Sequence, residues 1–208
     1  LAKQYLFEDA LSYYKKTYRL ELLGDSVHYL VYSCSQIAKM YEMLGEQDSA
    51  EVYYRRGFFH AGLTSHETPR YALLQNYAVF LMEQGEHQKA EEMLKEVETH
   101  ADSTYIYNVC SALSTLYCET GRYEEALFYG RKMLESHDSV MQCSGFLHLY
   151  KIYKRMGDME KAVCCHERYR WYDSDLTLRR KSVQVASLPH KMRVVQLEEE
   201  NSTAHPWL

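Results

Sequence analysis

Apolar positions along the chain recur three and four residues apart, on both sides of widely spaced glycines. In the first such segment Ile37, Ala38 and Tyr41 precede Gly45, and Tyr54 follows it. This spacing is typical of amphipathic helices, so each glycine is predicted to separate two helices of a hairpin.

The pattern is repeated four times, with an alanine five residues after each glycine. The pairs are Gly45/Ala50, Gly85/Ala90, Gly121/Ala126 and Gly157/Ala162, with successive glycines 40, 36 and 36 residues apart. Glycine tolerates the left-handed backbone that ends a helix, and a small alanine lets two helices approach closely. We therefore expect four helical hairpins.

Short polar residues lie where the first helix of each hairpin is expected to begin. They are Asp25 and Ser26, Thr68 followed by Pro69, Asp102 and Ser103, and Asp138. Such residues cap helix N-termini, so they agree with the register of the repeat.

The units resemble the tetratricopeptide repeat, whose pattern is a small residue, an aromatic residue, a turn glycine and a second small residue. The last unit departs from this pattern, because Tyr150 replaces the first small residue. This resemblance implies an all-α fold, a right-handed α-α superhelix of antiparallel helix pairs. Residues 1–168 form the expected solenoid, and residues 169–208 a long C-terminal capping or connector helix and tail. The expected units are a half repeat at 1–23 and full repeats at about 27–63, 69–100, 103–136 and 139–168.

The N-terminal segment fits the second helix of a further repeat. Ala10 occupies the alanine position, and Tyr13 and Tyr14 follow it. A chain that begins at Leu1, in the middle of a repeat, is expected to be a fragment of a longer protein.

The C-terminal segment is predicted to be one long helix, because no glycine interrupts it between Lys161 and Pro189. Beyond that proline, Leu188, Met192 and Val195 form a short apolar seam. The seam is interpreted as packing on the solenoid, as pairing with a second copy in a homodimer, or as a poorly ordered segment.

Composition narrows the classes of partner. The formal net charge is −5, so no broad basic field for nucleic acid is expected. No apolar run is long enough for a membrane span. The six cysteines are interpreted as free, mostly buried thiols, because their spacing fits neither a disulfide framework nor a metal site.

Catalytic and metal-binding motifs were not found in the sequence. The nearest metal-like run, Cys164, Cys165, His166 and Glu167, consists of consecutive residues that would point in different directions around a helix. We therefore expect no enzyme activity, no metal and no cofactor. An enzyme whose active site matches none of these motifs is kept as a separate hypothesis.

The resemblance implies that first-helix residues line a concave groove for a protein or an extended peptide. These candidates are Tyr32, Ser35, Gln36, Lys39, Gln75, Asn76, Val79, Met82, Asn108, Ser111, Thr115, Leu147, His148 and Lys151. Amides and tyrosines suit such a partner, because amides pair with backbone groups and rings supply apolar contact. An ordinary solvated surface is the alternative for each of these residues.

One subtype of the family is disfavoured. Its members hold a C-terminal carboxylate with a lysine, arginine and asparagines, but of these positions only Asn76 matches. A co-chaperone role is therefore not expected.

The tail, from Tyr172 to Glu200, resembles that of bacterial tetratricopeptide sensors. The leading hypothesis is a non-enzymatic protein- or peptide-binding domain, the sensing part of a bacterial signalling or regulatory protein. A cytoplasmic peptide-binding regulator and a free-standing adaptor are the alternatives. The sensor resemblance favours an extracytoplasmic, periplasmic location, and the cytoplasm is the alternative.

Overall fold

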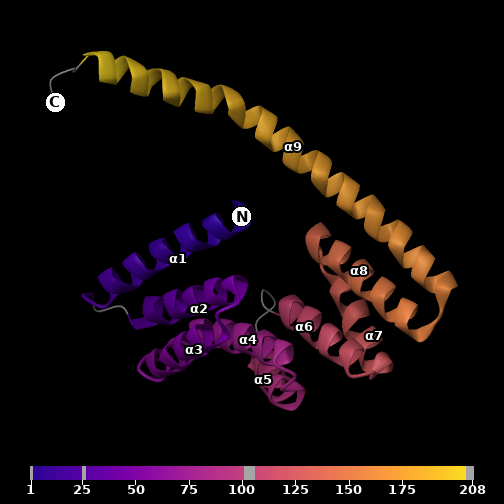
Figure 1. The fold of residues 1–208 in the computed structure, drawn as a ribbon. Helices are drawn as coiled ribbons and strands as arrows, with labels where there is room; N and C mark the ends of the chain where they lie inside the picture. Colours follow the sequence, from indigo (N-terminus) through magenta and orange to yellow (C-terminus); the bar gives the residue numbers. More distant parts are fainter. Residues whose placement is uncertain (1, 25–26, 101–105, 205–208) are drawn as a thin grey trace. The chain divides into compact units, whose positions relative to one another are not determined.

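A computed structural model describes residues 2–24, 27–100 and 106–204, with side chains from residue 6 to residue 182 within these ranges. All regular secondary structure in these ranges is helical, which confirms the all-α prediction (Figure 1). The elements are α1 Ala2–Glu21, α2 Val27–Leu44, α3 Gln47–Ala61, α4 Glu67–Glu83, α5 His87–His100, α6 Ile106–Glu119, α7 Tyr123–Lys132, the 3-10 helix η1 Met133–Glu135, α8 Ser139–Met156 and α9 Met159–Ala204.

The four repeat glycines have the same left-handed backbone. Their φ angles are 80° at Gly45, 79° at Gly85, 77° at Gly121 and 82° at Gly157. After each glycine, the next amide donates to a carbonyl five residues back, as Glu46 does to Tyr41 at 2.9 Å and Glu86 does to Leu81 at 2.9 Å. The prediction of a glycine turn is confirmed at all four positions, because this bond closes a Schellman-type helix end.

The repeat alanines lie between the helices that each turn connects. Ala50, Ala90, Ala126 and Ala162 are all fully buried. α2 packs against α3, α4 against α5, and α8 against α9. The absence of a larger side chain at these positions lets the two backbones approach closely.

The chain divides into two compact units, residues 1–129 and 130–208. In the first unit, the core between α2, α3 and α4 contains Val31, Tyr54, Leu73 and Phe80, each at most 4% exposed. Gly57 on α3 lies so close to Leu73 and to Cys34 that an added Cβ would come within 2.9 Å of the leucine.

Tyrosine–glutamate hydrogen bonds link successive hairpins within the first unit. The Tyr77 hydroxyl donates to Glu51 at 3.0 Å, and the Tyr117 hydroxyl donates to Glu91 at 2.7 Å. Both pairs are separated by 26 residues, so the repeat preserves this link. Each carboxylate follows a repeat alanine directly.

The helix α1 is held to the first hairpin by aromatic contacts. The Tyr18 hydroxyl lies 3.1 Å from Nε2 of His60, and its ring packs edge-on against Tyr53. Burial lowers the pKa of His60, because it disfavours the charged imidazole, and the nearby Arg56 acts in the same direction.

In the second unit, α8 packs on α9 through aromatic pairs. The rings of Phe146 and Tyr172 stack at 5.6 Å, and those of Tyr150 and His166 meet at 4.8 Å. Gly145 permits α8 to approach Gly130 and η1, since a Cβ there would come within 2.7 Å of Leu134.

The capping predictions had different outcomes. Asp138 caps α8 and accepts a hydrogen bond from the Val140 amide at 2.9 Å, as expected. Thr68 and Pro69, by contrast, lie inside α4, which begins at Glu67 with His66 as its N-cap. Asp25, Ser26, Asp102 and Ser103 lie outside the described residues.

The prediction of a long C-terminal helix is confirmed, since α9 continues through Pro189 to Ala204. The expected apolar seam at Leu188, Met192 and Val195 lies outside the residues whose side chains are described. No helix in the described ranges is both long and apolar enough to cross a membrane.

No disulfide joins the six cysteines, all of which lie in the described ranges. Cys34, Cys110, Cys118 and Cys143 are buried, as predicted for most of them, whereas Cys164 is exposed on α9. Burial raises the pKa of Cys34 to about 12, which keeps this thiol protonated at neutral pH.

Candidate functional site

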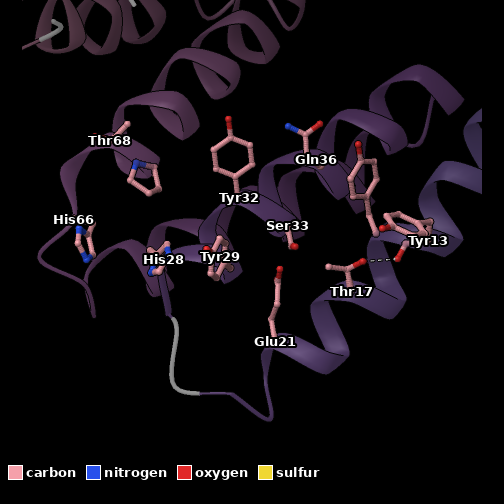
Figure 2. A pocket seen from close by; sticks show the side chains of 12 residues that line it. Tyr13, Thr17, Glu21, His28, Tyr29, Tyr32, Ser33, Gln36, His66 and Thr68 are labelled. Atoms are coloured by element: carbon pink, nitrogen blue, oxygen red, sulfur yellow. Dashed lines mark hydrogen bonds between the residues drawn. The ribbon is translucent and has the colours of Figure 1, made fainter.

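A pocket of about 570 Å³ lies in the first unit, between α1, α2 and the start of α4 (Figure 2). Helix α1 contributes Tyr13, Tyr14, Thr17 and Glu21 to its wall. Helix α2 contributes His28, Tyr29, Tyr32, Ser33 and Gln36, and the entry to α4 contributes His66, Thr68 and Pro69.

The spacing of these residues explains why they meet. Tyr13, Thr17 and Glu21 are four residues apart, so they form one stripe along α1. On α2, Tyr32 and Gln36 are likewise four residues apart. Because α1 packs against α2, the two stripes face the same space.

Aromatic and imidazole rings form much of the wall. The ring of His28 lies 4.0 Å from that of Tyr29 and 5.2 Å from that of His66, measured between centroids. Tyr13 and Tyr14 meet edge to face at 5.9 Å. Tyr13, Tyr29 and Tyr32 keep 67%, 55% and 49% of their surface exposed, so these rings offer area to a ligand.

Glu21 is the only acidic residue in the described wall, and that wall includes no lysine or arginine. Its side chain points from α1 toward Ser33 on α2 (Figure 2). Its Oε2 atom is closed to solvent, and no hydrogen-bond partner for it is present in the described part of the chain. A buried polar atom without a hydrogen-bond partner destabilises the fold by on the order of 1–3 kcal/mol.

The structure assigns two of the expected groove residues, Tyr32 and Gln36, to this pocket. The repeat pattern did not indicate its other residues. Tyr13 and Tyr14 had been assigned to an aromatic repeat position, and Glu21 and His66 belong to no motif. The four-residue stripe on α1 was the available signal for Tyr13 and Glu21, and the sequence held no such signal for Tyr14 and His66.

The other expected groove residues differ in exposure. Lys39, Val79 and Lys151 are exposed, whereas Gln75, Asn76, Asn108, Ser111, Thr115, Leu147 and His148 are half-buried. Ser35 and Met82 are only 3% and 7% exposed, so the expectation that they offer surface to a partner is not met. Ser35 is covered because Asn76 on α4 donates a hydrogen bond to its hydroxyl at 2.8 Å.

His148 on α8 lies in the second unit. Burial, with a smaller effect from Lys151, lowers the pKa of His148 to about 4. The imidazole is therefore neutral at pH 7, and any contact that it makes there is a neutral hydrogen bond or an apolar one.

The described residues offer little for metal binding or for cysteine nucleophiles. No group of three or more His, Cys, Asp and Glu side chains within them is arranged to hold a metal ion. The pKa of Cys143 and the pKa of Cys165 are raised, first of all by burial, as that of Cys34 is. An unactivated thiol is a weak nucleophile at neutral pH.

The fold and the pocket together define an all-α protein with an aromatic cleft between packed helices. No protein-family model matches the chain, and no curated protein does. Among solved structures, the chain is similar to BtubC (BKLC) from P. vanneervenii, with a TM-score of 0.68 and 21% identity. The match covers 85% of this chain and 76% of BtubC, and it shows a shared helical fold.

Proposed function

We propose that this chain is a non-enzymatic interaction domain of the tetratricopeptide type, in which successive helix pairs stack as a right-handed solenoid. It binds another protein or an extended peptide through the first helices of its repeats. The observation that carries this proposal is the aromatic pocket whose wall includes Tyr32 and Gln36 of α2, two of the expected first-helix residues.

The recurrence of one turn supports the repeat assignment. The four positive-φ glycines, the amide–carbonyl bonds that follow them and the four buried alanines have the same register. A stack of similar units presents a long surface, and such surfaces typically bind extended partners.

The composition of the first helices supports a peptide as the partner. Gln36, Gln75 and Asn76 have carboxamides that can donate to and accept from a peptide backbone. Asn76 already uses one amide hydrogen on Ser35, which fixes its orientation. The exposed rings of Tyr29 and Tyr32 on α2 supply apolar contact at a small entropic cost.

We assign the domain to the sensing part of a bacterial signalling or regulatory protein, because the sequence of its tail resembles that of bacterial tetratricopeptide sensors. A free-standing adaptor and a cytoplasmic peptide-binding regulator are the alternatives. The sequences that flank the 208 residues in the gene distinguish them, since a sensor requires an output domain after the tail.

Selection from a phage library of random peptides against the whole 208-residue chain tests peptide binding. We expect convergent peptides whose affinity, measured by fluorescence anisotropy, falls about tenfold in the Tyr32→Ala variant, because the substitution removes an aromatic anchor. Gln88→Ala, at an exposed position of α5, is the matched control and should bind normally. Absence of convergent peptides, or equal loss in both variants, would overturn the proposal.

A further inference from the structure

The pocket between α1 and α2 combines tyrosine rings with one carboxylate, that of Glu21, in its described wall. Tyr13 projects from α1, and Tyr29 and Tyr32 project from α2, and all three rings are about half exposed or more. The face of a tyrosine ring carries negative electrostatic potential, so several rings around one space favour a cation there.

Glu21 adds a formal negative charge to the same space. Its Oε2 atom has no hydrogen-bond partner among the residues that the structure describes, although it is closed to solvent. If the Glu21 side chain turned toward the pocket, a donor on a ligand would provide the missing hydrogen bond, and a charged donor would also compensate the carboxylate. Oε2 of Glu21 therefore indicates a ligand that presents a positively charged hydrogen-bond donor.

Other classes of ligand fit the wall less well. An anion would meet Glu21 and would find no lysine or arginine in the described wall to balance its charge. A metal ion is disfavoured because Glu21, His28 and His66 do not form a metal-binding group in the described residues. A purely apolar ligand would leave the carboxylate oxygen without a donor.

We propose that this pocket binds the arginine side chain of a partner peptide, with the guanidinium beside the tyrosine rings and its N–H groups directed at Glu21. The guanidinium is planar, stacks on aromatic rings and can donate two hydrogen bonds to one carboxylate. A volume of about 570 Å³ also accommodates residues next to the arginine. The identity of the partner as a peptide rests on the proposed function.

The test uses two small probes with the whole chain, N-acetylarginine N-methylamide and its neutral isostere N-acetylcitrulline N-methylamide. Amide shifts in ¹H–¹⁵N correlation spectra report binding at each residue. We expect the arginine probe to shift signals of α1 and α2 saturably, with a dissociation constant in the millimolar range. The citrulline probe should bind at least about tenfold more weakly, since it lacks the charge.

Variants assign the interaction to the pocket. Glu21→Gln should weaken binding of the arginine probe about tenfold, whereas Glu124→Gln, at an exposed position of α7, should leave it unchanged. The Tyr32→Phe variant keeps the aromatic ring and should bind the arginine probe normally. The Tyr32→Ala variant loses the ring and should bind the probe more weakly. Thermal unfolding of each variant checks that the fold is retained. We expect the Glu21→Gln variant to unfold at the same temperature as the unsubstituted chain.

The outcomes separate this inference from the proposed function. No saturable shift, equal binding of both probes, or an unaffected Glu21→Gln variant would overturn the arginine pocket. If library peptides still bound in that case, the interaction function would stand. If the arginine probe bound but no peptide did, the pocket would stand as a cation site and the peptide-binding function would fall.

Discussion

The glycine at the end of each first helix has a backbone conformation that other residues adopt at a cost. Gly85 has φ 79°, and an added Cβ there would meet no atom within 4 Å, so the cost of alanine is conformational alone. We expect Gly85→Ala to lower the free energy of unfolding by about 1–2 kcal/mol. Urea denaturation followed by circular dichroism measures the change.

Gly62 provides the matched control for this substitution. It lies after α3 in an ordinary right-handed conformation with φ −71°, and a Cβ there would have its closest contact at 3.5 Å. Gly62→Ala should therefore be neutral or stabilising by up to about 1 kcal/mol. Equal losses in the two variants would contradict the role given to the left-handed turn.

His148 should make stability depend on pH. Its pKa is about 4 in the folded chain, below the ordinary value of 6.5, because burial disfavours the charged imidazole. The unfolded chain therefore binds more protons between these values. The contribution of His148 to the stability of the fold is present above about pH 6.5 and is lost as the pH falls toward 4. The expected loss is on the order of 1–3 kcal/mol.

The variant His148→Gln isolates this contribution from that of the other titrating groups. Between pH 7 and pH 5, thermal unfolding of the parent should shift downward more steeply than that of the variant. Parallel pH profiles would contradict the lowered pKa. His60, whose pKa is also lowered, remains unchanged in both proteins and cancels in the comparison.

At the scale of elements, the tyrosine–glutamate bonds connect hairpins that share no turn. The hydroxyl of Tyr77 on α4 donates to Glu51 on α3, and burial together with this carboxylate raises the pKa of Tyr77 to about 12. We expect Tyr77→Phe to lower the free energy of unfolding by about 1 kcal/mol, because a partly exposed bond to a charged group is lost.

A double-mutant cycle with Glu51→Gln measures the coupling between the two side chains. The combined loss should be smaller than the sum of the single losses by about 0.5–1 kcal/mol. Tyr123→Phe is the control, since Tyr123 has no hydroxyl bond among those that link these hairpins. Strict additivity of Tyr77→Phe and Glu51→Gln would mean that the bond does not join the hairpins energetically.

The elements could be predicted well where a local rule determines them. The glycine turns and the Asp138 cap depend on a few consecutive residues, and the structure has them where the pattern indicated. The sequence predicts the start of α4 two residues too late, because proline favours the first helical position, whereas Pro69 is the third residue of α4. Its missing N–H is tolerated in the third position too, since no amide of the first turn has an intrahelical acceptor.

At the scale of the whole molecule, the two compact units divide the expected groove residues. Tyr32, Asn76 and Asn108 belong to residues 1–129, whereas Leu147, His148 and Lys151 belong to residues 130–208. The proposed pocket lies wholly within the first unit. Peptide binding at this pocket therefore depends first on α1, α2 and α4.

The candidate site was predicted only in part, because it depends on packing between segments that are distant in sequence. Tyr32 and Gln36 follow from the repeat register, but the position of Glu21 opposite Ser33 requires the contact between α1 and α2. The burial of Ser35 likewise depends on its bond to Asn76, 41 residues away. No local pattern in the sequence encodes either pairing.

Hydrogen–deuterium exchange of the whole chain, with and without a peptide selected from the random library, tests whether the peptide binds to the first helices of the repeats. We expect slower exchange in α1 between Tyr13 and Glu21, in α2 between Tyr29 and Lys39, and in α4 from Gln75 onward. Exchange in α3 and α5 should change little. Protection confined to α3 and α5, or no protection at saturating peptide, would contradict binding on the first-helix face.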